Sequence, residues 1–249
     1  MSKKHLIRNP YRPGDENRLQ FDDPALLKKF YSALALVARY FRYEVIGLEN
    51  IPRDSGALLV LNHGLFPIDQ LLLARRISLD LGRRTRTLAH RRSWMIPVLR
   101  EIALNMGIVN ATPANAVQLL KKGELVCVFP GGEREGTKPS SKKYRLLWEG
   151  RHGFIKVAIA AGVPIIPCMS VGVDDLYHVF PRPSGRISIF LSRYLPLPAF
   201  LGLGWFPLPR KITQFIGRPI RHRHQSVRAL HALVWRRSRR LLEDGLRMR

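Results

Sequence analysis

The sequence predicts an α/β fold in which a mixed, mostly parallel sheet is flanked by helices. Short apolar runs of strand length alternate with stretches whose apolar residues recur at helical spacing, and this alternation is typical of α/β domains. The chain has 249 residues, 46% of them hydrophobic, which is enough for one domain with a sizeable core. Because no internal repeat or long linker divides it, we expect a flexible arm over residues 1–22 and a single domain over residues 23–249.

The first element expected is an amphipathic helix over residues 23–42. Asp23 is a suitable N-cap, and Pro24 suits the first helical position. Lysines and arginines lie near both ends. The apolar face contains Leu27, Phe30, Tyr31, Leu34, Val37, Ala38 and Phe41. Two interpretations stay open: the face packs in the core, or the helix attaches the protein to a membrane surface, with apolar side chains among acyl chains and basic ones at the headgroups.

The remaining elements follow in alternation. Strands are expected at residues 43–47, 57–61, 85–89, 108–109, 125–129 and 163–169. Helices are expected at residues 68–81, 94–106, 112–121, 153–161 and 226–247, the last of them strongly basic. Gly82 and Gly107 each follow a helical stretch, as expected at helix C-termini, and two prolines interrupt the strand at 163–169. Cys127 and Cys168 lie in apolar runs, so we expect buried thiols rather than a disulfide or metal site.

The most informative stretch follows the apolar run at 57–61. Asn62, His63 and Gly64 come directly after it, and Asp69 opens the next helix. In open α/β sheets, ligands bind at the carboxyl ends of the strands. An imidazole and a carboxylate that bracket this turn form a plausible acid–base pair, because the carboxylate fixes the imidazole tautomer and stabilises its cation. The alternative is structural: His63 ends a strand, and Asp69 favours a helix N-terminus electrostatically.

A second strand, at 125–129, ends in the same way. After Pro130 come Gly131, Gly132, Glu133, Arg134 and Glu135. The glycine pair allows a close backbone approach to a ligand, and an arginine fork suits a phosphate or carboxylate. The alternative is a glycine turn that carries solvated charges. A third stretch, Val-Pro-Ile-Ile-Pro at 163–167, reads by itself as a core strand.

Taken together, the three stretches resemble the glycerolipid acyltransferase superfamily, which includes the 1-acylglycerol-3-phosphate acyltransferases. Within it, the chain is most similar to the branch of transmembrane protein 68 and, more distantly, type 2 diacylglycerol acyltransferases. Five residues separate His63 from Asp69 rather than four, and the glycine pair is followed by an Arg-Glu pair. The stretch from Trp148 through Arg151-His152-Gly153-Phe154 then leads into the strand at 163–167. The resemblance covers about residues 40–220.

The resemblance implies a reaction and a site. His63 would be the general base that removes the proton from an acceptor hydroxyl, and Asp69 would orient His63 and stabilise its cation. The activated oxygen would attack an acyl thioester directly, without an acyl-enzyme intermediate, a cofactor or a metal. The donor would be acyl-CoA or an acyl carrier protein. The expected substrate-binding residues are Asn62, Gly64, Gly131, Gly132, Glu133, Arg134, Glu135, Pro164 and Pro167. Backbone N–H groups near Gly64 or the glycine pair are candidate oxyanion donors.

Two departures from the family leave the acceptor open. Phosphate-accepting members carry Phe-Pro-Glu-Gly-Thr-Arg in the second motif, whereas Gly131 stands here in place of that Glu and Glu133 in place of the Thr. Those members also have an arginine shortly after a glycine that corresponds to Gly107, where this chain reads Ile-Val-Asn-Ala-Thr. The acceptor is therefore a lysophosphatidate or lysophospholipid, or else a mono- or diacylglycerol.

The net charge of the chain indicates which classes of molecule it binds. The net charge of +24 indicates anionic membrane lipids, phosphorylated donors, an acidic carrier protein or nucleic acid. The alternative to an acyltransferase is a basic nucleic-acid- or anionic-lipid-binding protein without catalysis, and a hydrolase that uses His63 on water is a third reading. We expect no specific nucleic acid, because no recognisable module or aromatic stacking platform accompanies the arginines.

The distribution of apolar residues predicts that the protein attaches to a membrane without spanning it. The stretch at 195–209 is uncharged and apolar, and it is either a loop over the core or a segment that dips into one leaflet with Trp205 at the interface. The sequence contains neither a secretory signal nor an apolar run of spanning length. We therefore expect a peripheral protein on the cytoplasmic face of a membrane.

Overall fold

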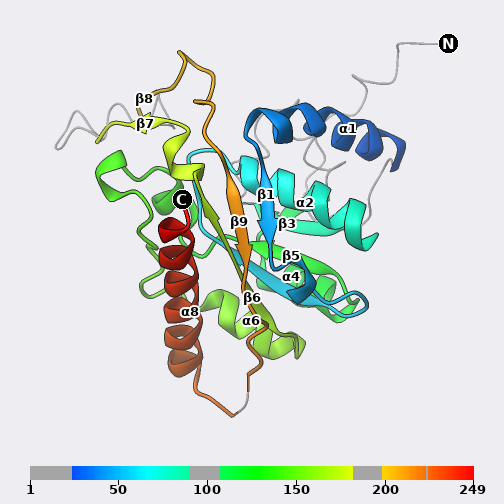
Figure 1. Cartoon of the computed structure of the whole chain (residues 1–249). Coiled ribbons are helices and arrows are strands. Elements are labelled where there is room, and N and C mark those ends of the chain that lie inside the picture. The colour runs from blue at the N-terminus through cyan, green and yellow to red at the C-terminus, as the bar shows by residue number, and fades with distance from the viewer. Residues whose placement is uncertain (1–23, 90–106, 182–197, 223) are drawn as a thin grey trace, which may run out of the picture.

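The computed structural model describes residues 24–89, 107–181, 198–222 and 224–249. In these residues a seven-stranded sheet has the order β1-β9-β6-β2-β5-β3-β4 (Figure 1). Its strands are β1 (Glu44–Ile46), β2 (Ala57–Leu61), β3 (Thr85–Ala89), β4 (Ile108–Asn110), β5 (Leu125–Val128), β6 (Ile165–Val171) and β9 (Thr213–Ile216). All neighbouring pairs are parallel except β6 and β9. The predicted α/β fold with a mixed, mostly parallel sheet is therefore confirmed.

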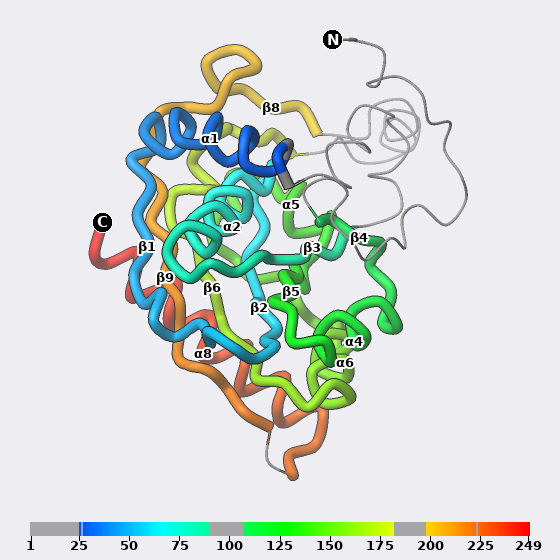
Figure 2. Tube along the Cα trace, turned by 90° about the vertical axis from the view of Figure 1, so that its right-hand side faces the viewer, coloured from blue at the N-terminus to red at the C-terminus, as the bar shows by residue number. Residues whose placement is uncertain are grey.

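Helices cover both faces of this sheet (Figures 1 and 2). They are α1 (Pro24–Tyr40), α2 (Ile68–Leu81), α4 (Pro113–Lys121), α6 (Gly153–Ala161) and α8 (Val227–Arg247), with a short α5 (Gly132–Gly136) beside the sheet edge. Alternate residues of β2 point to opposite faces. Leu58 and Val60 belong to the cluster that packs with α4, α6 and α8, whereas Leu59 and Leu61 pack with residues of α2. The central strand is apolar throughout because both its faces are buried.

Local signals set the helix ends. Gly82, with φ of 64°, ends α2, and the Thr112 hydroxyl accepts a hydrogen bond from the Asn115 N–H at the start of α4. Ser226 caps α8 in the same way. The predicted helices at 68–81 and 153–161 have the predicted bounds. The helix expected at 94–106 and the arm expected at 1–22 lie outside the described residues.

The first helix packs against α2, below it in Figure 2. Leu27, Tyr31, Leu34 and Phe41 are buried, whereas Leu36 is 74% exposed and Tyr40 is 43% exposed. Most of the apolar face thus lies in the core, and a smaller part faces outward. None of the described helices is both long and apolar enough to cross a membrane.

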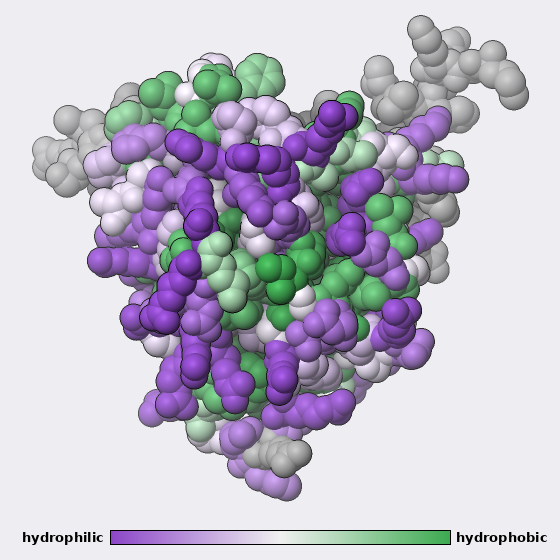
Figure 3. All heavy atoms as spheres, in the orientation of Figure 1, coloured by the Kyte–Doolittle hydropathy of each residue, from purple (hydrophilic) through white to green (hydrophobic). Residues whose placement is uncertain are grey.

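Two features differ from the expected pattern. Pro167 does not interrupt β6, because its carbonyl still accepts a hydrogen bond from the Gly217 N–H at 2.8 Å. The antiparallel strand β9 and the two-residue pair β7 (His178–Val179) and β8 (Phe200–Leu201) were not expected, since such short strands have little periodicity. After β8 the chain forms an apolar protrusion at the top of the molecule, where Trp205 is 83% exposed (Figure 3).

Candidate active site

Three adjacent parallel strands converge at one edge of the sheet. β2 ends just before His63, β5 ends before the turn into α5, and β6 ends before Asp174. Because these strands run in the same direction, their carboxyl ends bring the following loops together. The structure thus joins two of the stretches singled out in the sequence, around His63 and around Gly131.

His63 has a defined tautomer in this structure. Its Nδ1 lies 2.6 Å from the carbonyl oxygen of Gly64. A carbonyl can accept a hydrogen bond and cannot donate one, so Nδ1 holds the proton and the basic lone pair is on Nε2. The ring packs against Phe129, with 4.5 Å between centroids. Burial lowers the pKa of His63, and the Gly64 hydrogen bond offsets part of that effect. The imidazole is therefore neutral near pH 7, as a general base requires.

The backbone of His63 is held from both sides. Its N–H donates to Oε1 of Glu135 at 2.8 Å, and its carbonyl accepts a hydrogen bond from Nζ of Lys138 at 3.0 Å. Lys138 also pairs with Asp174 at 2.9 Å, and both side chains are buried. These contacts connect the loop after β2 with the segments after β5 and β6, so the position of the imidazole depends on all three.

Glu135 does not face a ligand, contrary to the expectation that it shapes the acceptor site. Its side chain is fully buried, and its second oxygen accepts a hydrogen bond from the N–H of Leu147 at 2.8 Å. Burial raises its pKa to about 7. A Cβ on Gly131 would come within 2.2 Å of Oε2 of Glu135, so this glycine is needed to make room for the buried carboxylate. The change from the family's Glu at this position thus has a steric reason.

Asp69 is also buried, in the first turn of α2. Its Oδ2 accepts a hydrogen bond from the hydroxyl of Ser170 at 2.5 Å, and Oδ1 has no side-chain partner among the described residues. Burial raises its pKa to about 6, although the Ser170 hydrogen bond acts in the opposite direction. The expected orientation of His63 by Asp69 is not seen at Nδ1, because the Gly64 carbonyl, one residue away, accepts the Nδ1 proton.

The side chain of Asn62 has a structural role. Its amide donates to the Ser170 carbonyl at 3.0 Å, and its Oδ1 accepts a hydrogen bond from the Ser170 N–H at 2.7 Å. Both functional groups of this side chain thus join the ends of β2 and β6 instead of pointing to a substrate. The same serine also holds Asp69, so Ser170 links two of the predicted site residues.

The two prolines lie at different heights along β2. The Pro164 carbonyl accepts a hydrogen bond from the N–H of Leu58, near the start of β2, whereas Pro167 is paired with Val60, the last residue but one of that strand. Pro164 therefore lies at the opposite edge, because a parallel strand begins where its neighbours begin. Its expected place in the substrate site is therefore at a distance from the His63 loop.

The glycine pair and its charged neighbours lie at the start of α5, directly after β5. Glu133 and Arg134 are exposed on α5. Gly132 has φ of 49°, and a Cβ there would lie 2.9 Å from Nη1 of Arg151, so a second guanidinium lies against the glycine pair. The N–H of Gly132 donates to the Phe129 carbonyl at 3.0 Å, which removes this amide from the candidate oxyanion donors.

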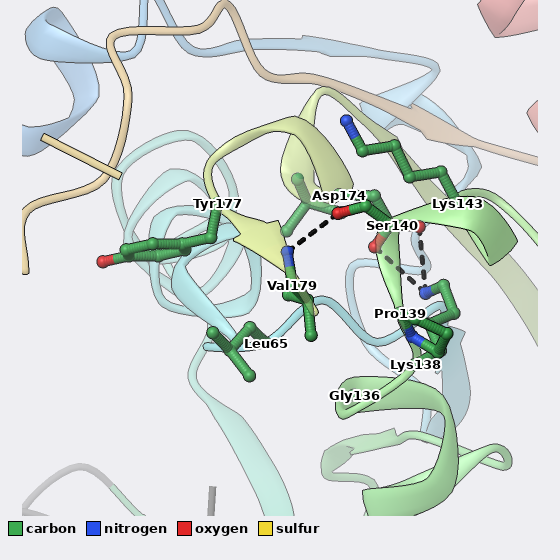
Figure 4. Close-up of a pocket in the computed structure, with 10 residues that line it drawn as sticks. Leu65, Gly136, Lys138, Pro139, Ser140, Lys143, Asp174, Tyr177 and Val179 are labelled. Atoms are coloured by element: carbon green, nitrogen blue, oxygen red, sulfur yellow. Dashed lines mark hydrogen bonds and ion pairs between the residues drawn. The ribbon is translucent and has the colours of Figure 1, made fainter. Parts of the chain in front are cut away.

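A narrow pocket opens beside the His63 loop (Figure 4). Leu65 and Tyr177 lie on one side and Lys138 on the other, with the Lys138–Asp174 pair visible behind. Gly136 also lines it, and a Cβ on Gly136 would lie 2.8 Å from Nδ1 of His63. The absence of a side chain at Gly136 thus leaves room for the imidazole next to the α5 backbone.

Sequence reasoning missed four residues that surround His63 or Asp69, namely Gly136, Lys138, Ser170 and Asp174. Lys138 and Asp174 are 36 residues apart, and Ser170 is 101 residues from Asp69. No local spacing relates such residues. For Gly136 a signal was present, because a third glycine so close to a glycine pair is unusual in a helix-forming stretch.

Comparisons with known proteins agree on a family. The family described as Acyltransferase matches residues 42–171. An uncharacterised protein of Mycobacterium tuberculosis is 36% identical over 188 residues, which cover 73% of this chain and 52% of that protein. The "DGAT1/2-independent enzyme synthesizing storage lipids" is 37% identical in Gallus gallus and 32% identical in Homo sapiens, covering 72% of this chain and 52% and 53% of those proteins. The chain thus spans about half the length of these relatives.

A solved structure has a similar fold. The 1-acyl-sn-glycerophosphate (LPA) acyltransferase PlsC from Thermotoga maritima matches with a TM-score of 0.61 over 90% of this chain and 80% of that chain. The two sequences are 21% identical.

Proposed function

Because the chain belongs to the acyltransferase family, we propose that it transfers a fatty acyl group from an acyl thioester to a hydroxyl group of a glycerolipid. The observation behind this proposal is the neutral imidazole of His63, protonated on Nδ1 and placed where three parallel strands end. The lipid-synthesising relatives support the substrate class.

In the proposed reaction, Nε2 of His63 accepts the proton of the acceptor hydroxyl as its oxygen attacks the thioester carbonyl. The carbon–sulfur bond then breaks, and the leaving thiolate receives the proton from the imidazolium. No protein thiol takes part. Cys127 and Cys168 are buried in β5 and β6, and burial raises the pKa of Cys127 to about 12. A thiol that stays protonated and inaccessible is a poor nucleophile.

We assign Asp69 the stabilisation of the imidazolium. A positive charge on His63 needs a negative partner that the Gly64 carbonyl does not supply. Asp69 is buried, only five residues separate it from His63 in the sequence, and its Oδ1 lacks a side-chain partner among the described residues. The amides of Gly64 and Gly131 remain the candidate oxyanion donors.

We propose that Arg134 and Arg151 bind an anionic part of a substrate. Gly132 belongs to the same site, because the Arg151 guanidinium lies against it. This anion is a phosphate of acyl-CoA or of the phosphopantetheine arm of an acyl carrier protein. The names of the chicken and human relatives favour a neutral mono- or diacylglycerol as the acceptor, which needs no phosphate site of its own.

We also propose that the protein attaches to the surface of an anionic membrane through an apolar ridge. The ridge consists of Leu36, Tyr40, Leu201, Leu203, Trp205 and Phe206, each at least 43% exposed. The Tyr40 hydroxyl donates to the Pro207 carbonyl at 2.7 Å, so α1 and the protrusion after β8 form one surface. Exposed large apolar side chains on one surface are typical of proteins that bind membranes or partners.

The test is acyl transfer from radiolabelled acyl-CoA and from acyl carrier protein to lysophosphatidate, monoacylglycerol and diacylglycerol. His63→Ala should abolish the product. The matched control is His222→Ala, a histidine that follows Ile220 at the opposite edge of the sheet, and it should keep wild-type rates. If His63→Ala retained near-normal activity, the proposed base would be wrong. If no donor and acceptor pair gave a product, a lipid-binding protein would be the better interpretation.

A further inference from the structure

A second pocket, of about 300 Å³, lies next to the apolar ridge. It is lined by Lys143, Asp175, Tyr177, His178, Leu208, Arg210 and Arg249. We propose that this pocket binds the phosphate of a phospholipid headgroup in the membrane to which the protein attaches. The inference rests on the proposed membrane attachment and adds a specific headgroup site to it.

The charges in the pocket favour an anion. Asp175 pairs with Lys143 at 2.8 Å and with Arg249, and it accepts a hydrogen bond from the hydroxyl of Tyr144 at 2.5 Å. Burial opposes its ionisation, but the hydrogen bonds from these three residues lower the pKa of Asp175 to about 2. The carboxylate is thus charged at neutral pH and balances one of the three cationic side chains of the lining, Lys143, Arg210 and Arg249. The lining keeps an excess of two positive charges.

Arg210 is the cation that remains available for a ligand. It is exposed and forms no ion pair with a described residue, whereas Lys143 and Arg249 both bind Asp175. Its backbone N–H donates to the Leu208 carbonyl at 2.8 Å, which fixes the turn that presents the side chain. A guanidinium binds a phosphate through two parallel N–H groups, which an ammonium cannot do.

The position of the pocket indicates a membrane lipid as the source of the phosphate. Leu208 and Arg210 come two and four residues after the ridge residue Phe206, and the Tyr177 hydroxyl donates to the Trp205 carbonyl at 3.3 Å. When Trp205 and Phe206 are among acyl chains, the pocket beside them lies at the level of the headgroups. Apolar side chains with adjacent cations are the usual arrangement for interfacial binding.

The experiment measures co-sedimentation of the full chain with vesicles of phosphatidylcholine alone and of phosphatidylcholine mixed with phosphatidylglycerol. Removing one cation that lies close to an anionic membrane weakens binding about fivefold through the loss of charge alone. Arg210→Gln therefore cannot separate a specific phosphate site from a general attraction. The informative variant is therefore Arg210→Lys, which keeps the charge and loses the guanidinium fork. We expect Arg210→Lys and Arg210→Gln to weaken binding to the anionic vesicles at least fivefold. The control, Arg221→Gln, removes an exposed arginine near Ile220 and should have no effect.

Two results would overturn the proposal. One is wild-type vesicle binding by Arg210→Lys with weakened binding by Arg210→Gln, which would reduce Arg210 to a non-specific surface charge. The other is unchanged vesicle binding by both Arg210 variants together with a raised KM for an acceptor in detergent micelles, which would assign the pocket to the acceptor. Repeating the vesicle measurements in the His63→Ala protein separates this site from catalysis, because that protein should bind vesicles without turning over.

Discussion

The carboxylate of Glu135 accepts a hydrogen bond from the backbone N–H of His63 at 2.8 Å, across 72 residues of sequence. With its other oxygen it accepts the N–H of Leu147 at the same distance. A buried carboxylate that binds two backbone amides holds three loops in fixed positions, and the candidate base is in one of them.

Replacing Glu135 should disturb the position of His63 rather than acceptor binding. Glu135→Gln keeps one acceptor oxygen and leaves one buried backbone N–H without a partner, so we expect about 1–3 kcal/mol of lost stability. Glu135→Ala should lose more and lower kcat at least tenfold, with little change in acceptor KM. Urea unfolding and steady-state kinetics measure both effects. A raised acceptor KM with unchanged kcat would instead support the sequence-based expectation that Glu135 contacts the acceptor.

Gly136→Ala should impair catalysis with a modest loss of stability. Its Cβ would lie 2.8 and 2.9 Å from two atoms of the His63 ring, so the imidazole must move. A displaced base costs about 10²-fold in rate, by analogy with small misplacements of other catalytic groups. The matched control is Gly153→Ala, since a Cβ there meets nothing within 4 Å. Equal kcat values for the two variants would contradict the assigned role of Gly136.

The Lys138–Asp174 pair should be sensitive to the loss of one partner. Both side chains are 5% exposed, so Lys138→Met leaves a buried carboxylate without its cation, at a cost of about 3–5 kcal/mol. Removing both charges in Lys138→Met/Asp174→Asn should recover part of this loss. Activity should not recover, because the hydrogen bond to the His63 carbonyl is still absent. A double-mutant cycle of unfolding free energies and kcat measures these effects. Purely additive unfolding free energies would show that the pair is not coupled.

Activity should fall in acid with a midpoint below the ordinary histidine value. Burial lowers the pKa of His63 from 6.5, and the reaction requires the neutral imidazole. kcat/KM should therefore rise with pH to a plateau, with its midpoint below 6.5. An NMR titration of the His63 ring proton in the free enzyme checks the assignment directly. A His63 midpoint above 6.5 would contradict the structure.

The free energy of unfolding should fall as the pH rises, because of the two buried acids Asp69 and Glu135. Burial raises the pKa of Asp69 from 3.8 to about 6 and that of Glu135 from 4.5 to about 7. The folded state therefore holds these protons more tightly than the unfolded chain, and the stability they contribute below about pH 4 is lost as the pH rises through 6 and 7. Asp69→Asn should remove the part of this pH dependence that Asp69 causes, a change in the free energy of unfolding on the order of 3 kcal/mol that is complete near pH 6. Urea unfolding of both proteins from pH 4.5 to 8 tests this, and parallel curves would refute it.

Much of the fold was predictable because its signals are local. The bounds of α2 and α6 follow from apolar periodicity and from the glycines after them, and Thr112 and Ser226 cap helices that begin where expected. Strand β9 was missed because its four residues mix polar and apolar side chains, and its place between β1 and β6 depends on pairing with both. Short strands are defined by their neighbours rather than by their own pattern.

By itself the sequence determined the α/β class, most element bounds and the placement of His63 at the end of an apolar strand. These depend on residues within one or two helical turns of each other, where spacing and capping act directly. The tertiary structure decided that Glu135 points inward, that Asp69 binds Ser170, and that Arg210 lies beside the Asp175 cluster. Each of those contacts joins segments distant in the sequence, and their geometry exists only once the strands are in register, so no local pattern could reveal it.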